Sequence, residues 1–234
     1  MIESTEGEAI TTVRLARPVR RNALTPAGLD ALGRAVDDAE RPVVYLHGEG
    51  PAFCAGADLD VVAGLDREAA EAFARRGQRV ARTIETADAV VVAGIDGPVR
   101  GGGVELALAC DLRVATPEAT FAETGVRLGL FGAWGGTERL PRVVGEGQAA
   151  DLALSGRTVD AEAALAMGLV SRIVDEPRTV AEEVAAHPAD ALAELKALLR
   201  AEVDREKRES REAAAFGRLV EAHAGEIRAS RETR

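Results

Sequence analysis

Two segments rich in glycine and alanine have residue types that could bind a negatively charged group. The first reads GPVRGGGVELALACD (residues 97–111) and follows a valine-rich run at 89–95. Its three glycines open an apolar helix, where unpaired backbone N–H groups favour negative charge. Glu105, one turn further on, supplies a carboxylate that could transfer protons beside those donors. On this stretch alone, a ligand site and a tightly packed turn are equally good interpretations.

The second segment of small residues has the same placement. Residues 51–59 read PAFCAGADL and follow an apolar run at 42–46 and a turn at 48–50. If the two apolar runs are neighbouring buried strands, the loop after each could direct one N–H to a single oxygen. That arrangement is an oxyanion hole, which stabilises the negative charge of an acyl-transfer or enolate intermediate.

The elements expected to position these loops alternate between strands and helices. Strands are expected at 9–16, 42–46, 89–95, 111–115 and 170–174. Helices are expected at 25–39, 66–86, 102–109 and 152–167, the last with a break at 158–160, and the chain is helical and highly charged from 176 onward. Such alternation implies parallel pairing in βαβ units and an α/β fold. No internal repeat and no Gly/Ser/Pro-rich linker marks a second domain.

Composition favours an enzyme that acts in solution. At 234 residues and 47% hydrophobic content, the chain is long enough for one domain with a sizeable core. Aromatic residues make up only 3%, so Ala, Val and Leu must form most of that core. The net charge of −10 argues against nucleic acid and anionic membrane as partners. With no apolar run long enough to span a bilayer and an acidic start, MIESTEGEA, a cytoplasmic protein is expected.

Cysteine and histidine form no recognisable motif. Cys54 and Cys110 lie far apart, so we expect neither a metal site nor a disulfide, and Cys54 is interpreted as a small buried thiol. The three histidines are isolated in the sequence and are assigned neither metal nor base roles. Lys196 and Lys207 are the only lysines, and the acidic excess fits either a salt-adapted source or a GC-rich genome.

Four segments, in this order and spacing, resemble the crotonase family of enoyl-CoA hydratases and isomerases. They are FCAGADL (53–59), GGGVELALACDLRVA (101–115), FAETGVRLGL (121–130) and GGTERLPRVVG (135–145). The similarity begins near 16–25 and continues through 154–174. The resemblance implies the ClpP/crotonase architecture, a right-handed spiral of ββα units at 1–174. It further implies a C-terminal helical region at 175–234 that covers the core or joins subunits into trimers or pairs of trimers.

The resemblance also assigns roles to individual residues. An acyl-CoA thioester oxygen would lie between the N–H groups of Ala57 and Gly102, and Glu105 would be the catalytic glutamate. Further substrate- or CoA-binding positions implied by the matched segments are Arg20, Arg21, Ala23, Ala55, Asp58, Leu59, Gly101 and Trp134. The two arginines would reach CoA phosphates, although a solvated surface charge is the alternative. Trp134 would narrow the acyl pocket, stack on substrate or pack at the mouth of the site. No cofactor beyond the CoA of the substrate is implied.

One position departs from the family pattern. Hydratases of this family use a second glutamate twenty residues after the first, and that position is Gly125 here. Glu123, two residues earlier, is a substitute only if the backbone has shifted, and otherwise a surface polar residue. The leading interpretation is an enoyl-CoA hydratase with Glu105 as principal base. The alternatives are a one-glutamate isomerase, hydrolase or decarboxylase, and a non-catalytic acyl-CoA-binding protein.

Overall fold

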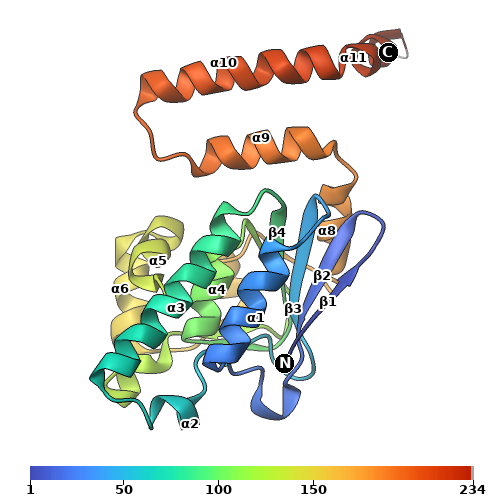
Figure 1. The fold of residues 1–234 in the computed structure, drawn as a ribbon. Helices are drawn as coiled ribbons and strands as arrows, with labels where there is room; N and C mark the ends of the chain where they lie inside the picture. Colours follow the sequence, from blue (N-terminus) through green and yellow to red (C-terminus); the bar gives the residue numbers. More distant parts are fainter. Residues whose placement is uncertain (233–234) are drawn as a thin grey trace.

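Parallel strands form the centre of the fold in the computed structural model, which describes residues 1–232 (Figure 1). The larger sheet has six strands in the order β1-β2-β3-β4-β6-β9. Only β1 runs antiparallel to its neighbour, so the parallel pairing expected from the sequence is confirmed. The bounds are β1 Ile2–Glu6, β2 Ile10–Leu15, β3 Val43–Gly48, β4 Val90–Ile95, β6 Leu112–Ala115 and β9 Arg172–Ile173.

A second sheet has three short strands, in the order β5-β7-β8. They are β5 Pro98–Arg100, β7 Thr120–Ala122 and β8 Val159–Asp160. Strand β4 leads to β5 and then to helix α4, Gly102–Ala109, while β6 leads to β7. Successive units therefore contribute one strand to each sheet before the chain turns into a helix, which is the ββα pattern expected from the resemblance.

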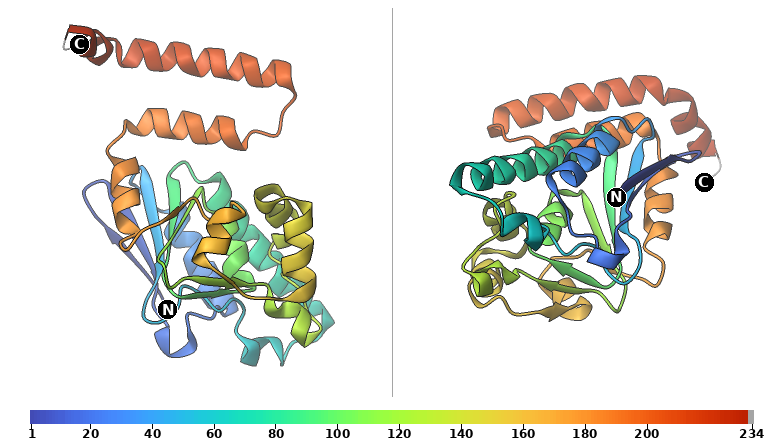
Figure 2. Two further views of the ribbon diagram at one scale, coloured as in Figure 1. Left: turned by 180° about the vertical axis from the view of Figure 1, so that it is seen from behind. Right: turned by 60° about the horizontal axis from the view of Figure 1, so that its bottom comes forward.

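Helices cover both faces of the larger sheet (Figures 1 and 2). Alternate residues of β3 point to opposite faces, because side chains alternate along a strand. Val44 and Leu46 join the main core with helices α1 (Pro26–Asp37), α3 (Arg67–Thr86) and α4. Val43 and Tyr45 join a smaller cluster under α8 (Arg178–Ala185). A strand buried on both faces reads as a continuous apolar run, which is why the sequence pattern identified it.

The predicted starts of two helices are confirmed by their caps. The hydroxyl of Thr25 accepts the N–H of Gly28 at the start of α1, with Pro26 at the first position. The carboxylate of Asp66 accepts the N–H of Ala69 at the start of α3, 2.8 Å away.

The break expected at 158–160 is confirmed, because two helices occupy this stretch, α6 at Glu146–Ser155 and α7 at Ala161–Ala166. The expected start at 152 is wrong, since α6 begins at Glu146. Gly156, with φ of 62°, takes the left-handed conformation that ends α6. Elements that the sequence pattern missed are β1, β5, β7 and β8, the 3₁₀ turns Pro18–Arg20 and Thr124–Leu128, α2 at Leu59–Val62 and α5 at Gly136–Val144. Most of these are short, and periodicity carries little signal over so few residues.

The C-terminal part is helical, as expected. Helix α8 packs Val180 and Ala181 on the sheet, so it forms part of the core rather than a separate cover. Helices α9 (Ala189–Arg200) and α10 (Arg205–Ala222) form a pair that extends beyond the core, followed by α11 (Ala224–Glu232) (Figures 1 and 2). The end of the expected region, 233–234, lies outside the described residues. Among residues 1–232, no helix combines the length and the hydrophobicity that a transmembrane segment requires.

Candidate active site

The two small-residue loops lie against each other. Strands β3 and β4 are adjacent, and the loop after each runs to the same place. The N–H of Arg100 donates to the carbonyl of Cys54 at 3.0 Å. A Cβ added to Gly56, whose φ is 84°, would lie 2.8 Å from the backbone nitrogen of Gly102. Only glycine fits this backbone conformation and this approach, so the FCAGADL and GGG segments are positioned by their lack of side chains.

Two backbone donors are free at this junction. Within residues 1–232, the N–H groups of Ala57 and Gly102 make no hydrogen bond, whereas that of Asp58 donates to Leu24 at 2.9 Å. Ala57 and Gly102 line one cavity of about 300 Å³ together with Glu105. Free N–H groups that share a cavity with a carboxylate can hold an oxyanion while the carboxylate moves a proton.

Glu105 is buried and held in place by backbone donors. Its side chain is 1% exposed, and its Oε1 accepts the N–H of Trp134 at 2.8 Å and that of Gly136 at 2.7 Å. Burial raises the pKa of the Glu105 carboxyl, while these two N–H groups and the charge of Arg139 oppose the rise. A Cβ on Gly136 or Gly132 would lie 2.8 Å from the carboxyl group, so both glycines are required for its close packing.

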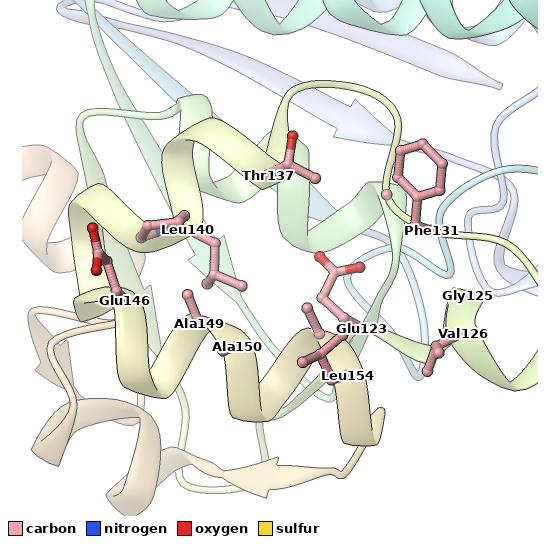
Figure 3. Close-up of a pocket in the computed structure, with 14 residues that line it drawn as sticks. Glu123, Gly125, Val126, Phe131, Thr137, Leu140, Glu146, Ala149, Ala150 and Leu154 are labelled. Carbon is pink, nitrogen blue, oxygen red and sulfur yellow. The ribbon is translucent and has the colours of Figure 1, made fainter.

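Glu123 is neither solvent-facing nor in the cavity of Glu105. It is 8% exposed and lines a neighbouring cavity of about 320 Å³ between the Thr124–Leu128 turn, α5 and α6 (Figure 3). Its Oε1 is buried without a hydrogen-bond partner among the described residues. Burial, followed by repulsion from Glu105, raises the pKa of Glu123 to about 8, so this carboxyl is mostly protonated at neutral pH.

The two cavities share three lining residues. Gly125, Phe131 and Gly132 line both of them, and the side chain of Phe131 is 73% exposed. In Figure 3 the carboxyl of Glu123 lies at the end of its cavity near Phe131, whereas Glu146 lies at the far end. At Gly125 a Cβ would lie 3.1 Å from Cα of Phe131 and 3.2 Å from the carbonyl of Leu130. Glycine therefore occupies position 125 because the next loop passes close to it.

Trp134 is a packing residue that narrows the cavity. Its side chain is 3% exposed, and its ring meets that of Phe73 edge-on with 5.8 Å between centroids. A Cβ on Gly77 or Gly102 would overlap the indole. Trp134 also lines the cavity with the predicted positions Ala55, Leu59 and Gly101.

Other predicted binding residues lie outside this cavity. Asp58 is buried, caps α2 and pairs with Arg17 at 2.5 Å. Arg20 pairs with Asp58 and Asp60, so its charge is already compensated. Ala23 is buried beside them, and its carbonyl accepts a hydrogen bond from Arg17. Within residues 1–232, Arg21 is exposed and makes no ion pair, which leaves it the more available of the two arginines.

Cys54 has no reactive environment. The thiol is fully buried and donates to the carbonyl of Asn22 at 3.3 Å, and burial raises its pKa to about 12. Cys54 and Cys110 are both free. No group of three or more His, Cys, Asp or Glu side chains within residues 1–232 is placed to hold a metal ion.

Sequence reasoning missed the groups that hold Glu105. The donors are backbone N–H groups of the 134–136 loop, and Arg139 of α5 lies beside that loop. The available signal was the segment GGTERLPRVVG, whose two leading glycines permit close backbone approach.

Comparison with known proteins decides the family. The profile of the Enoyl-CoA hydratase/isomerase family matches residues 5–224. The chain belongs to this family. It is 36% identical to crotonyl-CoA hydratase of Syntrophomonas wolfei over 182 residues, which cover 76% of this chain and 70% of that protein. It is 34% identical to short-chain-enoyl-CoA hydratase of Clostridium acetobutylicum over 183 residues, 75% of this chain and 70% of that protein.

Solved structures of the family have the same fold. An enoyl-CoA hydratase from Bacillus anthracis superposes with a TM-score of 0.93 at 30% identity and covers 100% of this chain and 96% of its own. A putative enoyl-CoA hydratase from Streptomyces coelicolor superposes with a TM-score of 0.92 at 33% identity, with coverages of 100% and 92%. The expected crotonase fold is confirmed, and so is the expectation of an enzyme of the hydratase/isomerase family.

Proposed function

We propose that this protein hydrates 2-enoyl-CoA thioesters. The observation that carries the proposal is a buried carboxylate, Glu105, in one cavity with the free N–H groups of Ala57 and Gly102. Relatives that share about a third of its residues are named crotonyl-CoA hydratase and short-chain-enoyl-CoA hydratase, which supports this reaction over others on the same fold.

The oxyanion hole would accept the thioester oxygen. As water adds to Cβ, electrons move onto that oxygen and an enolate forms. The N–H groups of Ala57 and Gly102 donate to it without reorganising, and the loss of one such donor typically lowers kcat by about 10²- to 10³-fold. No cofactor beyond the CoA of the substrate is required for this chemistry.

Glu105 would be the base. Its Oε1 is occupied by two N–H donors that stabilise the ionised form, and only that form can take a proton from water. The oxygen of that water then bonds to Cβ, and the C=C π electrons move into the enolate.

Glu123 would be the acid that protonates Cα. A hydratase needs one ionised and one neutral carboxyl, and environments that separate two pKa values supply such a pair. Burial and the charge of Glu105 keep Glu123 protonated at neutral pH. Gly125, Phe131 and Gly132 line both cavities, and Gly136, whose N–H binds Glu105, lines the cavity of Glu123, so the two carboxyls face adjoining spaces. After the enolate takes its proton from Glu123, a proton passes from Glu105 to Glu123 and restores both groups.

Arg21 would attract the CoA phosphates. Its charge and that of Arg127 act on Arg100, whose pKa is lowered first by burial and then by these two neighbours. Three arginines that repel one another form a local positive region on a chain whose net charge is −10. Phosphate would relieve this repulsion, so acyl-CoA affinity should fall as salt is added.

The experiment is a reaction with a small panel of CoA thioesters. The pure protein is incubated separately with enoyl-, hydroxyacyl- and malonyl-type thioesters, and products are identified by mass spectrometry. A hydroxyacyl-CoA formed from the enoyl substrate supports hydration. A shifted double bond, free acid or lost carboxyl group would favour the one-glutamate alternatives. Binding without any product would favour a non-catalytic acyl-CoA-binding protein.

Assembly and location complete the proposal. Leu195 and Leu199 of α9 and Phe216 of α10 are exposed apolar residues on the extended helical pair. A trimer or pair of trimers would bury them, and sedimentation of the pure protein tests this. A cytoplasmic location rests on composition and is tested by cell fractionation.

A further inference from the structure

A buried arginine supports the loop that holds Glu105. Nη1 of Arg139 donates to the carbonyl of Trp134 at 3.3 Å, and Nη2 donates to Oε2 of Glu85 at 2.6 Å. The turn between Trp134 and α5 is Gly135, with φ of 104°, and a Cβ there would overlap the guanidinium. Because Gly135 has no side chain, Arg139 can reach the loop whose N–H groups bind Glu105.

Glu85 continues this connection to α9. Its Oε1 accepts from Nη1 of Arg200 at 3.2 Å. Nη2 of Arg200 also donates to the carbonyls of Ala109 at 3.2 Å and Cys110 at 3.1 Å, at the C-terminal end of α4. That helix carries Glu105 in its first turn. One arginine of α9 thus contacts the helix of Glu105 directly and is connected through Glu85 and Arg139 to the loop that binds Glu105.

Two ion pairs of Asp111 hold α9 in this position. Asp111 accepts from Arg200 at 3.0 Å and pairs with the buried Lys196 at 2.8 Å. Lys196 also donates to the carbonyl of Ala89 at 2.7 Å, at the start of β4. Buried charges are stable only while every partner is present, so this network favours one geometry of α9 against the core.

We propose that Arg139 and Glu85 are positioning residues for Glu105, and that α9 contributes to that positioning through Arg200. The inference rests on the proposed role of Glu105 as the base. The geometry carries it, because each step from α9 to the carboxylate is a hydrogen bond between buried or half-buried groups. The charge of Arg139 opposes the rise that burial causes in the pKa of Glu105, and the charge of Glu105 in turn raises the pKa of Glu123.

The test compares two arginines of the same helix. Arg139→Met removes the buried charge and both hydrogen bonds, while Arg142→Met removes an exposed arginine that pairs with Glu138 and Glu202. We expect Arg139→Met to lower kcat about 10- to 100-fold with KM nearly unchanged, because a misplaced catalytic group costs mainly turnover. The acid limb of the kcat–pH profile should move to higher pH. Arg142→Met should leave kcat and the acid limb unchanged.

Further variants test the other members of the network. Arg139→Lys keeps a charge and should recover part of the loss, and Arg200→Met should move the acid limb in the same direction by a smaller amount. Glu85→Gln removes the anion that anchors Arg139 and should lower kcat without moving the acid limb to higher pH. If Arg139→Met does not fold, Glu85→Gln provides the decisive comparison, because a neutral amide fits the same space. An Arg139→Met enzyme that folds and keeps the wild-type kcat and acid limb would overturn the inference, as would a wild-type kcat in Glu85→Gln.

A readout independent of turnover separates this inference from the proposed function. Titration of isotope-labelled glutamate by NMR follows the Glu105 carboxyl directly in the wild type and in each variant. If the wild type hydrates no thioester, the proposed function fails, yet an upward shift of the Glu105 pKa in Arg139→Met still supports the positioning role. The same Glu105 titration curve in both proteins would contradict it.

Discussion

Trp134 contacts both Glu105 and the oxyanion hole. Its backbone N–H donates to Oε1 of Glu105 at 2.8 Å, and its indole lies against Gly102. One residue therefore supports the carboxylate through its main chain and closes the space beside the oxyanion hole through its side chain. The two contributions can be separated, because substitution changes the ring and leaves the N–H in place.

Trp134→Ala should enlarge the cavity and destabilise the fold. The ring is buried against Phe73, and truncation of a buried aromatic side chain costs about 3–5 kcal/mol. Because the backbone donor to Glu105 remains, hydration should persist, with a relative gain in kcat/KM for branched over linear acyl groups. Urea unfolding and kcat/KM for both substrate types provide the measurement. Unchanged selectivity would show that the ring does not limit the acyl pocket.

Gly102→Ala should be far more harmful alone than together with Trp134→Ala. The new methyl group would overlap the indole, which would displace the ring and the loop that binds Glu105. Removing the ring first provides the space, so the two effects should not add. A double-mutant cycle on kcat measures this coupling. Strict additivity would mean that the methyl group acts on the oxyanion hole itself and not through Trp134.

Glu123→Gln should stabilise the protein at neutral and alkaline pH. The unfolded chain releases this proton near the ordinary pKa of 4.5, whereas the folded protein holds it to about pH 8. Between these values the folded state binds more protons, so wild-type stability falls as pH rises, with a slope of up to about 1.4 kcal/mol per pH unit. The stability of Glu123→Gln should not fall with pH in this way, because the variant has no proton to release at this position. Denaturant unfolding across pH tests it, and parallel curves for the two proteins would contradict a raised pKa.

Gly125→Glu should not improve hydration, although it restores the family pattern. Its Cβ would lie 3.1–3.2 Å from the backbone of Leu130 and Phe131, so the loop must shift to accept a side chain. Overpacking of this kind typically costs about 1–3 kcal/mol. Gly125→Ala is the matched control for the backbone contact. Faster hydration by Gly125→Glu than by wild type would mean that the loop adapts and that the second glutamate had been lost.

The sequence predicted the elements that long apolar runs define. Strands β3 and β4 and helices α1 and α3 lie where periodicity and capping residues indicated, and the loops after β3 and β4 meet as expected. The position of Glu123 could not be predicted, because its burial depends on α5 and α6, which follow it in the chain and fold back against it. The two N–H donors to Glu105 could not be predicted either, because nearly every residue type has a backbone N–H.

The arginines illustrate a second limit. Arg20 and Arg21 are equivalent in sequence, yet Arg20 faces Asp58 and Asp60 and Arg21 faces no acid within the described residues. That distinction follows from the 3₁₀ turn at 18–20, where Arg21 takes a left-handed conformation with φ of 50°. Only the folded backbone determines which charge stays available for a phosphate.

The most direct test of the account is hydration of a short 2-enoyl-CoA in isotopically labelled water by the wild type and by Glu105→Gln. The account predicts that the wild type places the labelled oxygen on Cβ of a hydroxyacyl-CoA. It also predicts that Glu105→Gln still binds the thioester but turns it over at least about 10²-fold more slowly, as expected for a lost general base. Equal turnover by the two proteins, or a wild-type product without the labelled oxygen, would contradict a hydratase built on Glu105.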